Sequence, residues 1–191
     1  MTLASEDRDI LASIVHNALV AALKGDVYRP NDPPAGRGAL QAGGGCFVTL
    51  KTGGRLRGCI GCFESRQPIY KTVAEFTRHS ALDDPRFASN RLTTAELPLV
   101  EIDISILSPL ARCDDPAAIT LGVHGIHVRK GMRSGCFLPQ VAEETGWSLE
   151  EFWGHCCQDK AGLSWNAWRE PGVELLTFTA EIITLAPLGA R

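Results

Sequence analysis

CFVTLKTGGRLRGCIGCF, residues 46–63, is the stretch that decides the fold. Within it, segments 46–51 and 55–62 flank the short sequence Thr-Gly-Gly at residues 52–54. Glycine supplies the positive φ angles that a tight hairpin turn requires. The pattern therefore predicts two antiparallel strands joined by this turn.

Helical spacing and turn residues locate the elements on either side of the hairpin. Ser5, which acidic residues follow, is expected to cap a helix that ends at Gly25. Residues 29–45 are rich in proline and glycine and are expected to form a loop. A second helix is expected to begin at Pro68, because proline is favoured at the first helical position, and to end at residues 83–87.

The second half of the chain mixes short strands with short helices. Residues 99–107 alternate between apolar and polar side chains, which is typical of a half-buried strand. Ser148 is expected to cap a helix. The other expected elements are strands at 125–130 and 136–140 around a turn at 131–135, helices at 141–147 and 149–160, and a final strand at 173–185. Strands and helices follow one another without βαβ regularity, which indicates an α+β fold with a mostly antiparallel sheet flanked by helices.

Bulk composition indicates one globular domain over residues 1–191, with 45% hydrophobic and 21% charged residues. The net charge of −3 and the absence of a basic run disfavour nucleic acid as a partner. No apolar run approaches the ~20 residues that span a bilayer, and the acidic first residues do not resemble a signal peptide. The seven cysteines, an odd number without regular spacing, indicate reduced thiols and a cytoplasmic location.

Cys59 is the first candidate for chemistry. On a strand, alternate side chains share a face, so Arg57, Cys59 and Gly61 are expected on one face. A guanidinium beside a thiol favours the thiolate, and a glycine leaves room for a ligand or another backbone. The alternative is a buried structural cysteine, with Arg57 satisfying loop carbonyls.

The other cysteine motifs do not indicate a metal or redox site. Cys59 and Cys62 are three residues apart, which places them on opposite faces of a strand, and no second CxxC is present to complete a zinc site. His155, Cys156 and Cys157 are expected on a helix, where neighbours diverge by about 100°. No metal is therefore predicted, and the role of these three residues stays open.

Several segments in the same order resemble the AMMECR family, whose bacterial and archaeal members are called protein A of the AmmeMemoRadiSam system. The resemblance covers about residues 9–185. Its segments are CFVTLK, LRGCIGCF, DDPRF, VEIDISILSP, GVHGI, FLPQVAEETGW, EEFWGHCCQDKAGL, WNAW and FTAEI. LRGCIG together with LPQVA and KAGL is highly specific for the family.

The resemblance implies an α+β fold with a larger lobe around an antiparallel sheet, a smaller lobe, and a cleft between them. The family's characteristic residues correspond here to Arg57, Gly58, Cys59, Gly61, Arg86, Phe87, Leu138, Pro139, Gln140, Lys160, Ala161 and Gly162. One departure is Gln158, which stands where a cysteine is expected two residues before Lys160. A shift of one helical position rotates a side chain by about 100°, so Cys156 and Cys157 do not replace that cysteine.

Prokaryotic members of this family are encoded beside a Memo-like protein and a radical S-adenosylmethionine enzyme. This association implies an accessory or substrate-binding role with those partners, and it implies no particular cofactor. We expect a polar cleft lined by Arg57, Cys59, Arg86, Gln140 and Lys160, with Gly58 and Gly61 also in the binding set. Its basic groups suit a small anionic molecule or a carboxylate-bearing peptide end.

Two other function classes stay open. In the first, the protein is a thiol-dependent transferase or modifying enzyme, with Cys59 as the nucleophile, Arg57 as its activator, and His124 or His155 as a base. In the second, it is a protein-interaction module, for which an apolar surface patch is expected in place of a polar cleft.

Overall fold

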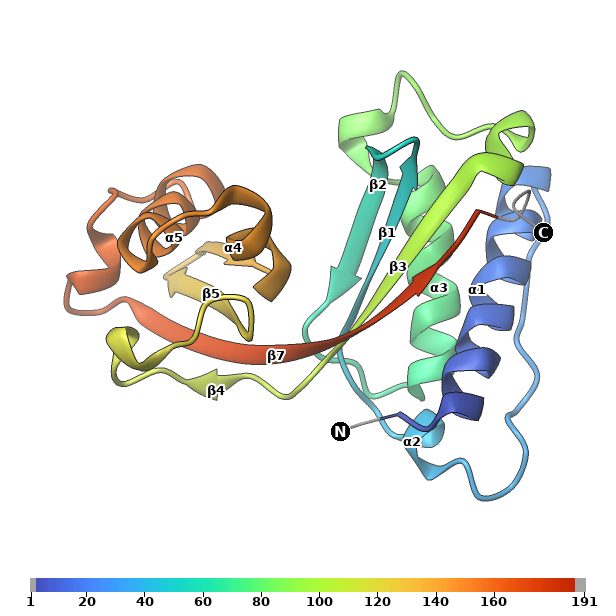
Figure 1. The fold of residues 1–191 in the computed structure, drawn as a ribbon, viewed down its shortest axis with the longest axis horizontal. Helices are drawn as coiled ribbons and strands as arrows, with labels where there is room; N and C mark the ends of the chain where they lie inside the picture. The colour runs from blue at the N-terminus through green and yellow to red at the C-terminus, as the bar shows by residue number, and fades with distance from the viewer. Residues whose placement is uncertain (1–2, 188–191) are drawn as a thin grey trace. The chain divides into compact units, whose positions relative to one another are not determined.

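A computed structural model describes residues 3–187 of the chain, which form two compact units (Figure 1). The first unit comprises the residues up to Leu107 and those from Glu181 onward, and the second comprises Ser108–Ala180. The combination of helices with antiparallel strands confirms the predicted α+β class.

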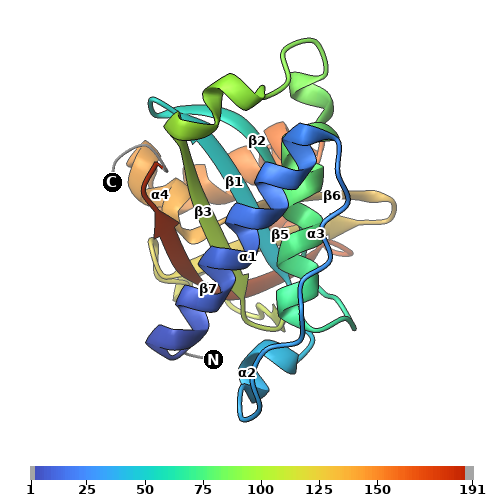
Figure 2. The ribbon, with the colours of Figure 1, turned by 90° about the vertical axis from the view of Figure 1, so that its right-hand side faces the viewer.

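The first unit consists of helices packed on an antiparallel sheet. Its elements are α1 (Ser5–Lys24), α2 (Gly38–Gln41), β1 (Cys46–Thr52), β2 (Arg55–Cys62), α3 (Ile69–Leu82), η1 (Pro85–Phe87), η2 (Thr94–Leu99) and β3 (Val100–Leu107). The strand order is β2-β1-β3, followed by the final strand β7 (Glu174–Leu185). Figure 2 shows α1 and α3 in front of these strands.

The core of the first unit fills the space between α1, α3 and one face of the sheet. Alternate residues of β1 and β3, such as Val48 and Ile104, point into this core and are fully buried. The opposite face carries the residues between them, including Thr49 and Asp103, which are paired across β1 and β3. This second face is therefore the one that carries polar side chains.

The β1–β2 hairpin has the predicted turn and one irregularity. Gly53 and Gly54 adopt φ angles of 54° and 72°, as a tight hairpin turn requires. Leu50 pairs with Gly58, whereas Lys51 pairs with Leu56, so Arg57 is an extra residue in a β-bulge. The bulge interrupts the strict alternation from which Arg57 is predicted on the face of Cys59.

The second unit also consists of strands covered by helices. Its elements are β4 (Ala111–Arg112), η3 (Pro116–Ala118), β5 (His124–Lys130), β6 (Arg133–Phe137), α4 (Pro139–Thr145), α5 (Leu149–His155), the π-helical turn η4 (Cys156–Lys160), η5 (Ala167–Arg169) and the first part of β7. β5 pairs with both β6 and β7, and β4 pairs with β7. Phe152, Trp153 and Ile126 are fully buried in its core.

Most element boundaries agree with the predictions to within about two residues, but several do not. β6 begins at Arg133, inside the predicted turn 131–135, and the predicted helix 149–160 divides into α5 and the turn η4. Ser5 lies inside α1, and Ala4 is the cap. Residues 138–140 do not extend a strand, because Pro139 begins α4, where its missing N–H is not needed. The loop 29–45 contains the short helix α2, which its fully buried Leu40 anchors. Within the described residues, no helix is long and apolar enough to cross a membrane.

Candidate functional site

Cys59 lies in the middle of β2, on the polar face of the first unit's sheet. It pairs with Thr49 of β1, whose hydroxyl donates a hydrogen bond to the Cys59 sulfur at 3.2 Å. Asp103 of β3, next to Thr49, accepts from Lys51 at 3.1 Å and from Thr184 at 2.8 Å. The thiol therefore belongs to a polar row that crosses the strands.

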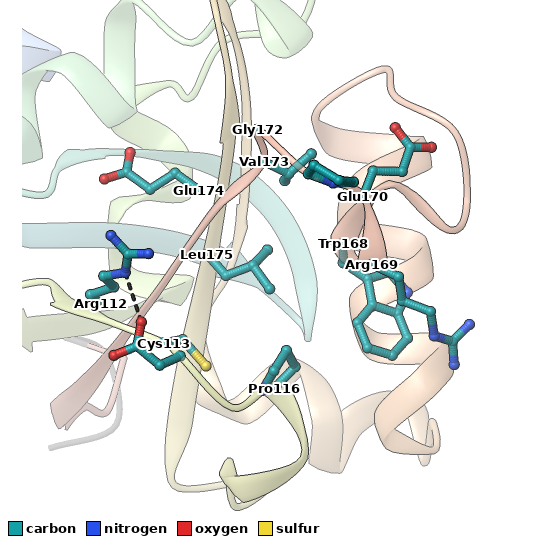
Figure 3. A pocket seen from close by; sticks show the side chains of 12 residues that line it. Arg112, Cys113, Pro116, Trp168, Arg169, Glu170, Gly172, Val173, Glu174 and Leu175 are labelled. Carbon is teal, nitrogen blue, oxygen red and sulfur yellow. Dashed lines mark hydrogen bonds and ion pairs between the residues drawn. The ribbon is translucent and has the colours of Figure 1, made fainter.

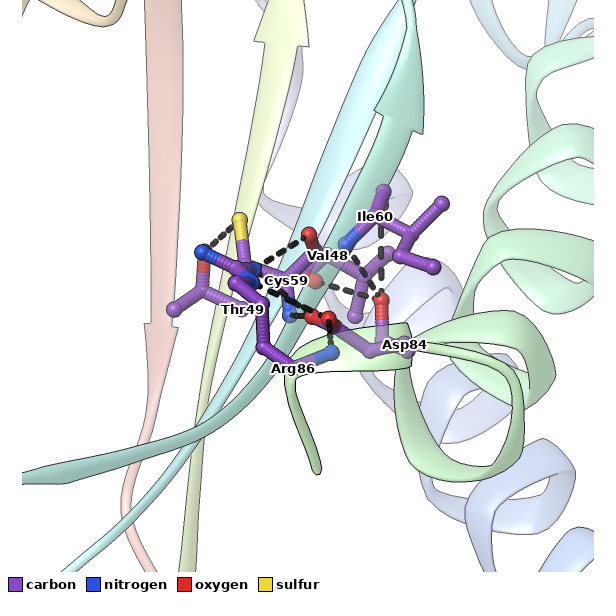
Figure 4. A network of polar contacts seen from close by, with 7 residues as sticks. Val48, Thr49, Cys59, Ile60, Asp84 and Arg86 are labelled. Carbon is purple, nitrogen blue, oxygen red and sulfur yellow. Dashed lines mark hydrogen bonds and ion pairs between the residues drawn. The ribbon is translucent and has the colours of Figure 1, made fainter. Parts of the chain in front are cut away.

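Asp84 fastens the turn after α3 to the edge of β2. Its carboxylate is 4% exposed and accepts from the backbone N–H of Cys59 at 2.9 Å (Figure 4). It also accepts from Nε and Nη2 of Arg86 at 3.0 and 2.6 Å and from the Arg86 backbone N–H at 3.1 Å. The guanidinium of Arg86 holds the pKa of Asp84 below its usual range, although burial opposes this shift.

Arg86 reaches Cys59 from the same turn. Nη2 of Arg86 donates to the Cys59 carbonyl oxygen at 3.1 Å (Figure 4). The Asp84 carboxylate raises the pKa of Arg86, and the side chain of Cys59 adds to this effect. About half of the Arg86 side chain, 52%, stays exposed. The structure thus brings two predicted site residues together through a third that was not predicted.

Arg57 has different partners. Its guanidinium pairs with Glu96 of η2 and donates from Nη2 to the carbonyl oxygen of Asn90 at 3.2 Å. Its Nε is buried without a hydrogen-bond partner among the described residues. Within residues 3–187, none of its hydrogen bonds goes to Cys59. The contact with the Asn90 carbonyl oxygen agrees with the predicted alternative in which Arg57 hydrogen-bonds a loop carbonyl.

Gly58 and Gly61 each permit a close backbone approach. A Cβ atom on Gly58 would lie 1.9 Å from the carbonyl oxygen of Ser80 in α3. A Cβ atom on Gly61 would lie 2.1 Å from the carbonyl oxygen of Cys46 and 2.6 Å from Phe47. Of the two uses predicted for Gly61, the approach of another backbone is the one observed.

Ser80 locks α3 onto both strands of the hairpin. Its hydroxyl donates to the carbonyl oxygen of Val48 at 2.7 Å and accepts from the backbone N–H of Ile60 at 2.9 Å. Ser80 is 1% exposed, so these bonds are made in the interior. They help to hold β2 in the register that presents Cys59.

Cys62 lies on the opposite face of β2 from Cys59, as predicted. It pairs with the fully buried Cys46, and burial raises the pKa of the Cys62 thiol. All seven cysteines of the chain are free. Between residues 3 and 187, no group of three or more His, Cys, Asp or Glu side chains is arranged to hold a metal ion.

Gln140 and Lys160 belong to the second unit. Lys160 ends the turn η4, and its ammonium lies 5.5 Å from the ring centroid of Phe137. A Cβ atom on Gly135 would lie 2.6 Å from Cβ of Lys160, so this glycine lets η4 pack against β6. Gln140 lies in the first turn of α4, and its Oε1 atom is buried without a hydrogen-bond partner among the described residues. A single site that unites these two residues with Arg57, Cys59 and Arg86 stays a prediction.

The second unit also has an open pocket of about 800 Å³ (Figure 3). It is lined by apolar side chains such as Trp168 and Leu175, together with Cys113 and the ion pair between Arg112 and Asp114. None of the predicted site residues lines it. The chemistry expected at Cys59 therefore does not coincide with this pocket.

Comparison with known proteins gives the family. The AMMECR1 family model matches residues 12–183. The chain belongs to the AMMECR1 family. It is 37% identical over 185 residues to Protein MK0488 of Methanopyrus kandleri, which covers 93% of this chain and 87% of that protein. A protein of Methanothermobacter thermautotrophicus is 34% identical over 188 residues, which covers 94% of this chain and 95% of the relative.

The fold agrees with that of a solved structure. The crystal structure of the uncharacterized protein PH0010 from Pyrococcus horikoshii matches with a TM-score of 0.82 and 33% identity. The match covers 94% of this chain and 92% of that chain. The family and the α+β fold are thus established, and the activity is a separate question.

The cysteines near the family's KAGL segment are core residues. Cys156 and Cys157 are both 0% exposed, and burial raises the pKa of each thiol. His155 instead stacks on Trp147, with ring centroids 4.0 Å apart, and its Nδ1 lies 2.8 Å from the Asp159 carboxylate. His155 therefore has different surroundings from the two cysteines, which share the core of the second unit.

Sequence reasoning missed three residues of the candidate site: Thr49, Ser80 and Asp84. Asp84 had a local signal, because an aspartate before proline is a common start of a short helix. Thr49 and Ser80 had none, since their partners depend on the register of β1 with β2 and on the packing of α3.

Proposed function

We propose that this AMMECR1-family chain is a ligand-binding component of a cytoplasmic system that includes a Memo-like protein and a radical S-adenosylmethionine enzyme. In this proposal, residues 1–191 form a single AMMECR domain. The binding set comprises Arg57, Gly58, Gly61, Arg86, Gln140 and Lys160, with Cys59 beside it. The role and the partners both rest on the resemblance described above.

The arrangement of Arg86 is the observation that carries the proposal. Its Nε and Nη2 atoms donate to Asp84, and Nη2 also donates to the Cys59 carbonyl oxygen, which fixes the guanidinium. Because 52% of the side chain is exposed, part of the guanidinium is accessible to a ligand. An exposed guanidinium that is held in place suits a carboxylate or phosphate oxygen.

The charges around Cys59 favour a small anion over a polyanion as the ligand. Each nearby cation already has a carboxylate partner: Arg57 has Glu96, Arg86 has Asp84, and Lys51 has Asp103. In each of the three pairs the positive and negative charges cancel, so this face has no net positive charge from them. It therefore does not attract polyanions in the way that an unpaired basic cluster does. A ligand with one carboxylate or phosphate group fits this balance best.

The test is a titration of the protein with small carboxylates and with inorganic phosphate. Binding is detected by calorimetry and by the shift in the thermal unfolding temperature. The wild-type protein is expected to show saturable binding that Arg86→Gln abolishes. Arg78→Gln is the matched control, because Arg78 is also half-exposed and paired with an aspartate, Asp83. Equal binding by wild type and Arg86→Gln would remove Arg86 from the site.

A thiol-dependent enzyme is the second candidate. It is favoured by the contacts of the Cys59 thiol with the Thr49 hydroxyl and with Arg86. In this case a covalent adduct on Cys59 is expected when the protein is incubated with extracts of its own cells. Peptide mass spectrometry detects it, with Cys59→Ser as the negative control and Cys62 as the internal reference. A protein that stays unmodified at Cys59 and functions in cells as Cys59→Ser contradicts this candidate.

A further inference from the structure

Two arginines of the family's characteristic segments are candidates to act on Cys59. Their hydrogen-bond partners differ, and this difference indicates which arginine acts. Arg86 hydrogen-bonds the Cys59 carbonyl oxygen and interacts with its side chain. Arg57 is taken up by Glu96 and Asn90. Because the effect of a charge on a thiol falls with distance, the arginine that contacts Cys59 is the one expected to act on its sulfur.

The charge of Arg86 is itself offset by Asp84. The carboxylate is buried and contacts both Nε and Nη2, which fixes the plane of the guanidinium. It also binds the backbone N–H of Cys59, so one side chain positions both the cation and the strand (Figure 4). The thiol therefore faces a cation and an anion that are held together.

We propose that the Asp84–Arg86 pair, and not Arg57, controls the reactivity of the Cys59 thiol. Arg86 is the cation in contact with Cys59, and Asp84 is a positioning residue that holds Arg86 and partly offsets its charge. Thr49 contributes to the same surroundings by donating its hydroxyl hydrogen to the sulfur. The inference rests on the proposed site at Cys59 but not on the identity of its ligand.

Alkylation by iodoacetamide measures this reactivity directly. The Cys59 thiolate forms a bond from sulfur to carbon, iodide leaves with the electron pair, and the thiol proton passes to the buffer. The rate is read from the Cys59 peptide by mass spectrometry in the otherwise native chain. The half-buried Cys113 of the second unit serves as an internal reference thiol.

Two substitutions at the pair are expected to have opposite effects. Asp84→Asn leaves Arg86 uncompensated, so labelling of Cys59 accelerates. Arg86→Gln removes the cation, so labelling slows. A close neighbouring charge changes thiolate formation by about tenfold or more, and the partial exposure of Arg86 reduces the expected change in labelling rate to about threefold to tenfold in each direction.

The chain offers close controls for both changes. Asp83→Asn and Arg78→Gln alter an exposed ion pair on the same segment without a contact to Cys59, and labelling is expected to stay within about twofold of wild type. Arg57→Gln is expected to change the rate less than Arg86→Gln does. A larger effect at Arg57 would overturn the assignment.

The sign of the two effects separates electrostatic control from simple loosening of the structure. If Asp84→Asn and Arg86→Gln both accelerate labelling, loss of packing explains the result and the proposal is wrong. If Asp84→Asn does not fold, Arg86→Lys decides, because it keeps the charge and must label faster than Arg86→Gln. If the protein binds no anion but Cys59 labels as expected, the proposed function is contradicted and this inference stands.

Discussion

The segment 56–63 on β2 and the segment 155–160 around η4 resemble each other in sequence and differ in the folded molecule. Each combines cysteines with a basic residue. Cys59 is half-buried and contacts Thr49 and Arg86, whereas Cys156 is fully buried among apolar side chains. The comparison teaches that the surroundings of a cysteine in the folded protein decide whether its thiol is chemically accessible. The number of cysteines and basic residues in its sequence segment does not.

The backbone explains this difference. A strand directs alternate side chains to opposite faces, so β2 buries Cys62 toward Cys46 and directs Cys59 to the polar face. The turn η4 is π-helical, and its wider winding accommodates two successive cysteines in the core of the second unit. Glycines adjacent to both segments permit the close packing.

The largest expected effect comes from these glycines. Gly58→Ala would place Cβ 1.9 Å from the Ser80 carbonyl oxygen, so α3 must move and the free energy of unfolding falls by about 3 kcal/mol. Gly154→Ala would place Cβ 2.2 Å from the indole ring of Trp165, and we expect a smaller loss of about 1 kcal/mol, because a half-buried side chain and not the backbone is in the way. Urea unfolding measures both.

Gly38→Ala is the control for this pair, because nothing lies within 4 Å of its added Cβ. Equal losses for Gly58→Ala and Gly154→Ala would show that the β2 segment is not the more tightly packed of the two.

Substitution of the cysteines sharpens the comparison further. Cys156→Ser places a hydroxyl in an apolar core and is expected to lower the free energy of unfolding by about 2 kcal/mol. Cys59→Ser is expected to lower it by only about 0.5 kcal/mol, since Thr49 is able to hydrogen-bond the new hydroxyl. Chemical denaturation of the two variants provides the measurement. A larger loss at Cys59 would reverse the assignment of structural and accessible cysteine.

Mild acid is expected to act first on the second unit through His127. Burial lowers the pKa of His127 to about 4, with a contribution from Arg129. The stability that follows from its neutral form is complete above the unfolded pKa of about 6.5 and declines as the pH falls toward 4. We expect a loss of about 1.5 kcal/mol between pH 7 and pH 4.5. Comparison with His127→Leu isolates this component, and identical pH profiles would disprove it.

Stronger acid is expected to act on the first unit through Asp84, with the smallest effect of the four. Its hydrogen bonds with Arg86 lower its folded pKa, so its contribution is present above the unfolded pKa of about 3.9 and is lost as the pH falls through the folded value. Between pH 5 and pH 3, the wild type should lose about 1 kcal/mol more than Asp84→Asn. Parallel profiles would mean that the ion pair does not stabilise the unit.

Much of the fold follows from local patterns. The β1–β2 hairpin, the end of α1 at Gly25, the cap of α5 at Ser148 and the final strand were all predicted. The turn η4 and the bulge at Arg57 were not, because neither leaves a distinctive pattern over a few residues. The bulge matters for the candidate site, since it interrupts the alternation that relates Arg57 to Cys59, and Arg57 instead bonds to Glu96 and Asn90.

The sequence by itself determined the properties that depend on near neighbours. Gly53 and Gly54 turn the hairpin because only their own φ angles are involved, and Cys59 and Cys62 face opposite ways because a strand repeats every two residues. Only the tertiary structure decided that Arg86 contacts Cys59. Asp84 and Arg86 are 25 and 27 residues from Cys59 in the chain, and the packing of α3 on the sheet brings them to β2. Such pairings depend on how helix and sheet fill the core together, which no local pattern records.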